Sequence, residues 1–136
     1  MNLVSIRIIT ENVMQLVAFY QKVTNLKAVQ FTEDFAEIRT PSATLAIGSI
    51  QTLAFFTDTT IAEAAQNRSA IIELICPDVD VEYDRLQQDI ASQVIQIPTI
   101  MPWGNKSLLF RDPDGNLVNL FSPVSEAALL KFEGKF

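Results

Sequence analysis

Two residues of opposite charge, Arg7 and Glu73, stand inside apolar stretches 66 positions apart, in LVSIRII and AIIELIC. A carboxylate can act as a general base, and a guanidinium can stabilise an oxyanion. Together they are weak candidates for a proton transfer on a small molecule. They can equally neutralise each other as a structural ion pair, and the sequence leaves both alternatives open.

Trp103 lies in the loop sequence IPTIMPWG, directly after Pro102. An indole held in a stiff loop offers a flat surface for stacking on an aromatic or cationic ligand, and the alternative is packing beneath the loop. Further candidates for an aromatic or soft apolar surface are Phe35, Phe55, Phe56 and Met101. For Phe55 and Phe56, a dimer contact or ordinary core packing is an equal alternative.

The chain contains no histidine and one cysteine, Cys76. No intramolecular disulfide can form, and we expect Cys76 to be a buried small apolar residue in a reducing, cytoplasmic setting. Imidazole and thiolate are the common ligands of zinc and its neighbours. The acidic residues, which are the alternative ligands for Mg²⁺ or Ca²⁺, stand at predicted helix starts and turns, namely Glu11, Asp78, Asp80, Asp112 and Asp114. We therefore expect no metal and no cofactor.

The size and charge of the chain limit its partners. With 136 residues, 49% of them apolar, it has enough material for one domain. A net charge of −6 argues against nucleic acid and favours a neutral or cationic ligand. No apolar run reaches the ~18 residues of a membrane span, so we expect no membrane association.

The elements that would position these residues follow one order twice. Strand alternation and helical spacing predict β-α-β-β-β from a strand at 3–9, a helix at 13–23, and strands at 28–31, 35–40 and 43–48. The order repeats as a strand at 70–76, a helix capped by Asp78, and strands at 93–98, 107–112 and 116–122. Lys106 and Ser107 are expected at a solvated strand edge, with a polar ligand contact as the alternative.

A turn sequence, a linker and a tail mark the limits of the two modules. The sequence DPDG at 112–115 predicts a hairpin turn in which Gly115 adopts a positive φ. We expect a single domain over 1–136, made of modules at about 3–48 and 70–123. The linker 49–69 contains a possible strand at 52–56, and the tail 124–136 contains a short amphipathic helix.

The repeat, the FY at 19–20, the PWG at 102–104 and above all DPDGNLVNL at 112–120 resemble the glyoxalase / bleomycin-resistance / extradiol-dioxygenase (vicinal oxygen chelate) superfamily. The resemblance covers about 3–123. It implies an α+β fold in which two βαβββ modules form a curved, partly closed eight-stranded sheet, with helices outside and a ligand cup inside. It also implies a homodimer, in which the partner chain often completes the cup.

Enzymes of this superfamily hold a divalent metal through His and Glu side chains on the first and last strands of each module. Carried over by position, these ligands fall on Ser5, Ala46, Ile71 and Asn119. Alanine and isoleucine have no donor atom, and hydroxyl or amide oxygens are weak donors for such ions. The resemblance therefore implies a cup that has lost its metal but can still hydrogen-bond a ligand through Asn119.

Strand parity predicts which side chains line that cup. Residues that share the parity of the former ligand positions should point inward: Ser5, Arg7 and Ile9; Ile71, Glu73 and Ile75; Leu117, Asn119 and Phe121. The resulting ligand-binding candidates are Ser5, Arg7, Phe35, Glu73, Met101, Trp103, Asn119 and Phe121.

Three functions fit these residues. The first is a metal-independent small-molecule binding protein, similar to bleomycin-resistance-type proteins that sequester an antibiotic, with an amphipathic or aromatic, neutral or cationic ligand. The second is a metal-free isomerase or lyase that uses Glu73 and Arg7. The third is a dimeric regulatory scaffold whose cavity is filled by side chains. A metal-dependent glyoxalase or dioxygenase is not expected.

Overall fold

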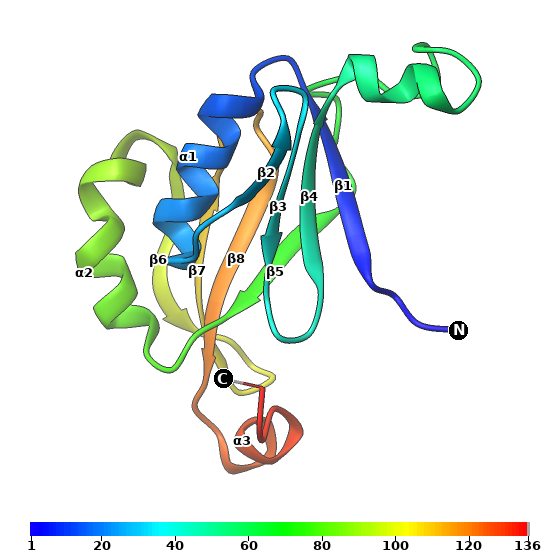
Figure 1. Ribbon diagram of the computed structural model, residues 1–136. Helices are drawn as coiled ribbons and strands as arrows, with labels where there is room; N and C mark the ends of the chain where they lie inside the picture. The colour runs from blue at the N-terminus through cyan, green and yellow to red at the C-terminus, as the bar shows by residue number, and fades with distance from the viewer. Residues whose placement is uncertain (136) are drawn as a thin grey trace. The chain divides into compact units, whose positions relative to one another are not determined.

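The computed structural model describes residues 1–135, which divide into two compact units, Met1–Asn67 and a second that begins at Arg68 (Figure 1). Each unit contains a four-stranded mixed sheet and a long helix. The expected α+β class and the repeated β-α-β-β-β order are confirmed. Backbone pairing within the described residues gives two sheets of four strands, in place of one continuous sheet of eight.

The first unit begins with a strand and a helix and then forms three further strands. Its elements are β1 (Ser5–Thr10), α1 (Val13–Thr24), β2 (Val29–Thr32), β3 (Phe35–Arg39) and β4 (Thr44–Ser49). The strand order is β1-β4-β3-β2, in which β1 pairs with β4 in parallel and the other pairs are antiparallel. The first strand of the unit therefore lies beside its last.

Local signals fix both ends of α1. The Oδ1 atom of Asn12 accepts a hydrogen bond from the backbone N–H of Gln15 at 3.0 Å, which satisfies one of the free amides of the first turn. Asn25 adopts a left-handed conformation, with φ of 55°, and ends the helix. The apolar face of the helix, centred on Leu16 and Tyr20, is buried and packs on β3 and β4.

The second unit repeats this design. Its elements are β5 (Ile71–Ile75), α2 (Val79–Ile90), a short 3₁₀ turn η2 (Ala91–Gln93), β6 (Val94–Ile100), β7 (Asn105–Arg111), β8 (Leu117–Pro123) and α3 (Glu126–Lys131). The strand order is β5-β8-β7-β6, with β5 and β8 parallel. As predicted, the last element is a short helix, and the Oγ atom of Ser125 caps it.

Helix α2 covers one face of the second sheet. Asp78 caps the helix through its Oδ1 atom, and the buried Leu86 and Ile90 face β6, β7 and β8. An ion pair joins Lys106 on β7 to Asp80 on α2, so the even-numbered residues of β7 lie on the face that α2 covers. The odd-numbered residues of β7 therefore belong to the face that α2 does not cover.

The hairpin between β7 and β8 is built on one buried carboxylate. Asp112 is 2% exposed; its Oδ1 atom accepts from the backbone N–H groups of Asp114 and Asn116, both at 2.9 Å, and its Oδ2 atom accepts from the Asn116 amide at 2.7 Å. Gly115 has φ of 82°, as predicted. The turn sets the register in which Leu109 lies opposite Asn119.

The prediction of a strand at 52–56 is wrong. Residues Ile50–Phe55 form a 3₁₀ helix, η1, that continues directly from β4. The Oγ atom of Ser49 accepts from the backbone N–H of Gln51 at 3.1 Å, and the Thr52 hydroxyl donates to the Ser49 carbonyl at 2.7 Å. These local bonds favour a turn of helix over an extended chain. Among residues 1–135, no helix combines the length and apolar character needed to cross a membrane.

Candidate functional site

The face of the first sheet that α1 does not cover carries the predicted residues of β1. Arg7 lies opposite Ala46, and Ser5 lies opposite Thr44, in the parallel pairing of β1 with β4. Across the next strand pair, Ala46 lies opposite Glu37. Since alternate residues of a strand share a face, these side chains form one surface, whereas the fully buried Ile38 belongs to the other face.

Arg7 makes cation–π contacts with two aromatic rings on this surface. Its guanidinium carbon lies 4.9 Å from the centre of the Phe35 ring and 5.7 Å from that of Phe56. Gly48 lies beneath this pair, since a Cβ atom there would be in ordinary van der Waals contact with Phe35 at 3.5 Å and Arg7 at 3.6 Å, and in tight contact only with the Thr52 hydroxyl at 3.0 Å. Arg7 is exposed, and Phe56 is 65% exposed, so the guanidinium and the rings remain open to a ligand.

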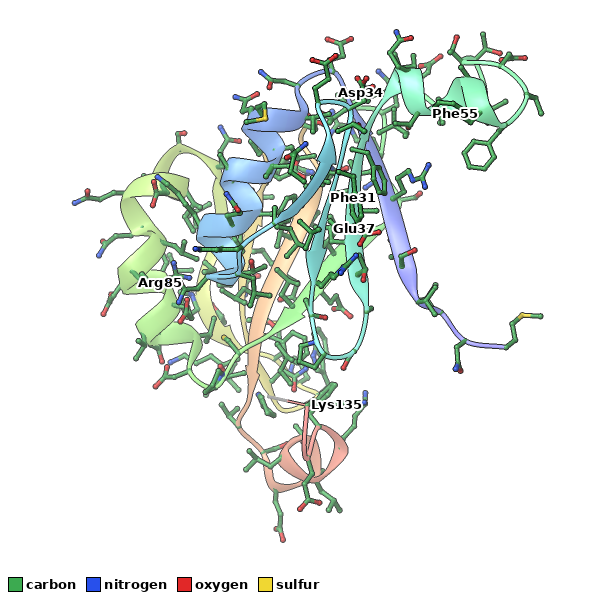
Figure 2. The ribbon with its side chains drawn as sticks, in the orientation of Figure 1. Phe31, Asp34, Glu37, Phe55, Arg85 and Lys135 are labelled. Atoms are coloured by element: carbon green, nitrogen blue, oxygen red, sulfur yellow. The ribbon has the colours of Figure 1, made fainter. Side chains whose placement is uncertain are left out.

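A second arginine extends the surface along β3. Phe31 lies 5.7 Å from Phe35 between ring centres, and the guanidinium of Arg39 lies 5.6 Å from the centre of Phe31. Arg39 also forms an ion pair with Glu37 at 2.8 Å. Figure 2 shows Phe31 and Glu37 on the first sheet, and Phe55 in the segment that follows β4. We call Arg7, Phe31, Phe35, Arg39 and Phe56 the arginine–phenylalanine surface.

The uncovered face of the second sheet brings Glu73 and Asn119 together. They are direct neighbours in the parallel pairing of β5 with β8, and the Nδ2 atom of Asn119 donates a hydrogen bond to the Oε1 atom of Glu73 at 3.0 Å. The predicted shared face of these two residues is therefore confirmed. A carboxylate only accepts hydrogen bonds, so Glu73 fixes the amide with its NH₂ group toward β5.

Three buried oxygens on this face have no hydrogen-bond partner among the described residues. They are the Oδ1 atoms of Asn119 and Asn105, residues that are each 8% exposed, and the Oγ atom of Ser107, which is 2% exposed. Ser107 lies opposite Phe121 on β8 and is a diagonal neighbour of Asn119. Buried polar atoms usually find a partner, so these unpaired oxygens can accept hydrogen bonds from a donor outside the chain.

The expectation of a solvated edge for Ser107 is wrong. Strand β7 lies between β8 and β6, so it is an interior strand. Leu108 and Phe110, both fully buried, occupy the α2 side, which leaves Ser107 on the face of Asn119. The alternation in SLLFR was the available signal, but its meaning depends on strand order.

The remaining candidates occupy different environments. Trp103 is 65% exposed in the turn between β6 and β7, whereas Met101 is half-buried at the same turn. Phe121 is buried at 6% exposure, and its ring lies 5.2 Å from that of Phe132 near α3. Arg7 and Glu73 belong to different units, and each has the contacts described above within its own unit.

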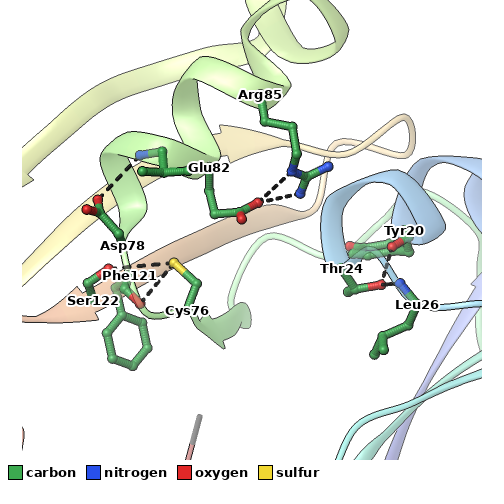
Figure 3. Close-up of polar contacts among 10 residues, drawn as sticks. Tyr20, Thr24, Leu26, Cys76, Asp78, Glu82, Arg85, Phe121 and Ser122 are labelled. Carbon is green, nitrogen blue, oxygen red and sulfur yellow. Dashed lines mark hydrogen bonds and ion pairs between the residues drawn. The ribbon is translucent and has the colours of Figure 1, made fainter.

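Cys76 is buried at the end of β5 as expected (Figure 3). Its Sγ atom lies 3.6 Å from both the Phe121 carbonyl oxygen and the Ser122 hydroxyl. Burial raises the pKa of the thiol, and the negative charges of Glu82 and Asp78 act in the same direction. The Ser122 hydroxyl opposes this shift and does not overcome it. The sulfur therefore stays a neutral thiol around neutral pH.

The side chains do not fit a transition metal. Within residues 1–135, no group of three or more His, Cys, Asp or Glu side chains is arranged to hold an ion. The former ligand positions offer a hydroxyl at Ser5, nothing at Ala46 and Ile71, and an amide at Asn119. The amide nitrogen is already committed to Glu73.

The comparisons with known proteins agree with this fold. The family model "Glyoxalase/Bleomycin resistance protein/Dioxygenase superfamily" matches residues 2–120, and the chain belongs to this superfamily. No curated protein matches the sequence.

Solved structures give the same result. A protein described as a "conserved domain protein" is 28% identical, with a TM-score of 0.71 over 90% of this chain and 99% of its own. A glyoxalase/bleomycin resistance protein/dioxygenase from Nocardioides is 20% identical, with a TM-score of 0.73 over 93% and 85%. A family enzyme from Burkholderia phytofirmans is 14% identical, with a TM-score of 0.77 over 91% and 100%. At these last two identities, the likeness concerns the fold.

Proposed function

We propose that this chain is a metal-independent small-molecule binding protein whose ligand is aromatic or amphipathic, as in a drug-sequestering protein. The observation that carries the proposal is the arginine–phenylalanine surface on the first sheet. Arg7 stacks on the Phe35 and Phe56 rings, and Phe31, which lies beside Phe35, remains 53% exposed.

Such a surface suits a flat ligand for two reasons. Aromatic rings and guanidinium planes both stack on π systems. A flat ligand can therefore stack on the phenylalanine rings and on the arginine side chains alike. The rings are also partly pre-positioned by their contacts with Arg7 and Arg39, so less conformational entropy is lost on binding. A ligand that covers Phe31 and Phe56 would remove exposed apolar area from water.

The test is calorimetric titration with a panel of aromatic compounds of one and two rings, charged and neutral. We expect at least one compound to bind, and Phe56→Ala to weaken its binding roughly tenfold. Phe55→Ala is the matched control, because Phe55 is a neighbouring phenylalanine with 90% exposure that lies outside the surface. Absence of binding by every compound would overturn the proposal. Equal losses for Phe55→Ala and Phe56→Ala would remove the surface from it.

A further inference from the structure

We propose that Asn119, Ser107 and Glu73 form a subsite for a protonated amino or amidino group of the ligand. This inference rests on the proposed binding function and names one chemical group that the second sheet can recognise. It concerns the second sheet alone and uses two of the three unpaired oxygens on the face that α2 leaves uncovered, those of the diagonal neighbours Asn119 and Ser107.

The orientation of Asn119 decides what the subsite accepts. Its NH₂ group is engaged by the Glu73 carboxylate at 3.0 Å, so its Oδ1 atom is the group left to bind a partner. That atom can only accept a hydrogen bond. The ligand group must therefore present N–H or O–H donors, and a group with acceptors alone, such as a carboxylate, would face an acceptor.

Ser107 adds a second polar group at a suitable distance. Diagonal neighbours on adjacent antiparallel strands lie about 7 to 8 Å apart, and their side-chain oxygens can converge on one group between them. The hydroxyl of Ser107 can accept from an N–H donor while Asn119 accepts from another. An ammonium or amidinium group has several donors and can satisfy both oxygens at once.

Charge favours a cation over a neutral donor. Glu73 forms no ion pair within the described part of the second unit, residues 68–135, and its side chain is exposed on the edge strand β5. The carboxylate lies directly beside Asn119, so a cation at the amide would meet an opposite charge at close range. A charge-assisted hydrogen bond is about twice as strong as a neutral one.

The test compares 1-naphthylmethylamine, 1-naphthalenemethanol and 1-naphthoate, which share one ring system and differ in the group they carry. We expect the amine to bind roughly tenfold more tightly than the alcohol, and the naphthoate to bind most weakly. The amine should also shift the side-chain amide resonances of Asn119 in a ¹⁵N-labelled sample. Its affinity should fall as the salt concentration rises.

Glu73→Gln is the deciding variant, because Glu73 is exposed and the replacement keeps its shape. It removes the charge and lets the Asn119 amide invert, so the amine should lose roughly tenfold in affinity while the alcohol changes less than threefold. Asp84→Asn, an exposed change of equal charge on α2, should alter neither.

The outcomes separate this inference from the proposed function. If all three compounds bind equally, or Glu73→Gln leaves amine affinity unchanged, the cation subsite is refuted and the aromatic-binding function stands. If none of the three binds, nor any aromatic compound of the wider panel, the proposed function fails and takes the subsite with it. If the amine binds without moving the Asn119 amide resonances, the subsite is refuted even though a cation is bound.

Discussion

Gly104 and Ser125 approach each other so closely that no side chain fits between them. A Cβ atom on Gly104 would lie 1.9 Å from the Oγ atom of Ser125 and 2.7 Å from its Cβ atom. The Gly104 carbonyl accepts hydrogen bonds from the backbone N–H groups of Val124 and Ser125, at 2.9 and 3.0 Å. The turn that carries Trp103 is thereby tied to the start of α3.

Gly104→Ala should lower the free energy of unfolding by about 3 kcal/mol or more, because it combines a clash with the Ser125 side chain with a φ of 91°. Gly134→Ala is the control for the backbone conformation alone, since φ there is 72° and no atom lies within 4 Å. It should cost about 1 kcal/mol. Urea unfolding followed by circular dichroism measures both, and similar losses would show that Ser125 moves aside.

Asp112→Ala should destabilise the protein by about 2 to 3 kcal/mol, because it removes the carboxylate that accepts from one buried backbone N–H group, one part-buried backbone N–H group and one buried side-chain amide. The exposed Asp84→Ala on α2 should change stability by less than about 0.5 kcal/mol. The same urea titration compares them. Equal midpoints for the two variants would contradict a structural role for the Asp112 carboxylate.

Arg7→Ala and Phe35→Leu should each weaken stability modestly, and their effects should not add. The stacking distance of 4.9 Å predicts a coupling energy of about 0.5 to 1 kcal/mol at this exposed site. A double-mutant cycle in urea measures it. The pair Arg7→Ala with Phe55→Ala should show no coupling, because Phe55 lies outside the surface.

The raised pKa of Cys76 makes stability fall at alkaline pH. In the unfolded chain the thiol ionises near its ordinary pKa of about 8.5, whereas the folded protein holds its proton to higher pH. The unfolded state therefore binds fewer protons above that pH, and the free energy of unfolding decreases as pH rises from about 8.5 toward the folded pKa.

Cys76→Ala should remove this component, so that the difference between the two proteins shrinks between pH 8 and 10 under reducing conditions. Reaction with a thiol reagent at pH 8 should also be much slower in the folded protein than in urea, since the sulfur is buried and neutral. A thiol that reacts equally fast in both states would contradict the environment described for Cys76.

Much of the fold follows from local patterns. Period-two alternation placed the strands within one or two residues, and Asn12 and Asp78 marked the helix starts because their side chains cap free amides. The pattern failed at Ile50–Phe55, where apolar residues suggested a strand but the Ser49 and Thr52 hydroxyls stabilise a 3₁₀ helix.

Strand parity predicted only part of each candidate site, for a related reason. Parity placed Glu73 and Asn119 on one face, and the register confirms it. Ser107 required the order of strands, which alternation does not contain. Phe56 reaches Arg7 from beyond η1, so its role depended on the one segment whose conformation the pattern did not predict.

The pairing of each unit's first strand with its last has a consequence for synthesis. Strand β1 pairs with β4, and β5 pairs with β8. Neither sheet can therefore be completed until its final strand has left the ribosome. The amino-terminal sheet can close once Ser49 has emerged, whereas the carboxyl-terminal sheet needs Pro123. A ribosome stalled between those points would carry one finished sheet and one whose opening strand has no neighbour.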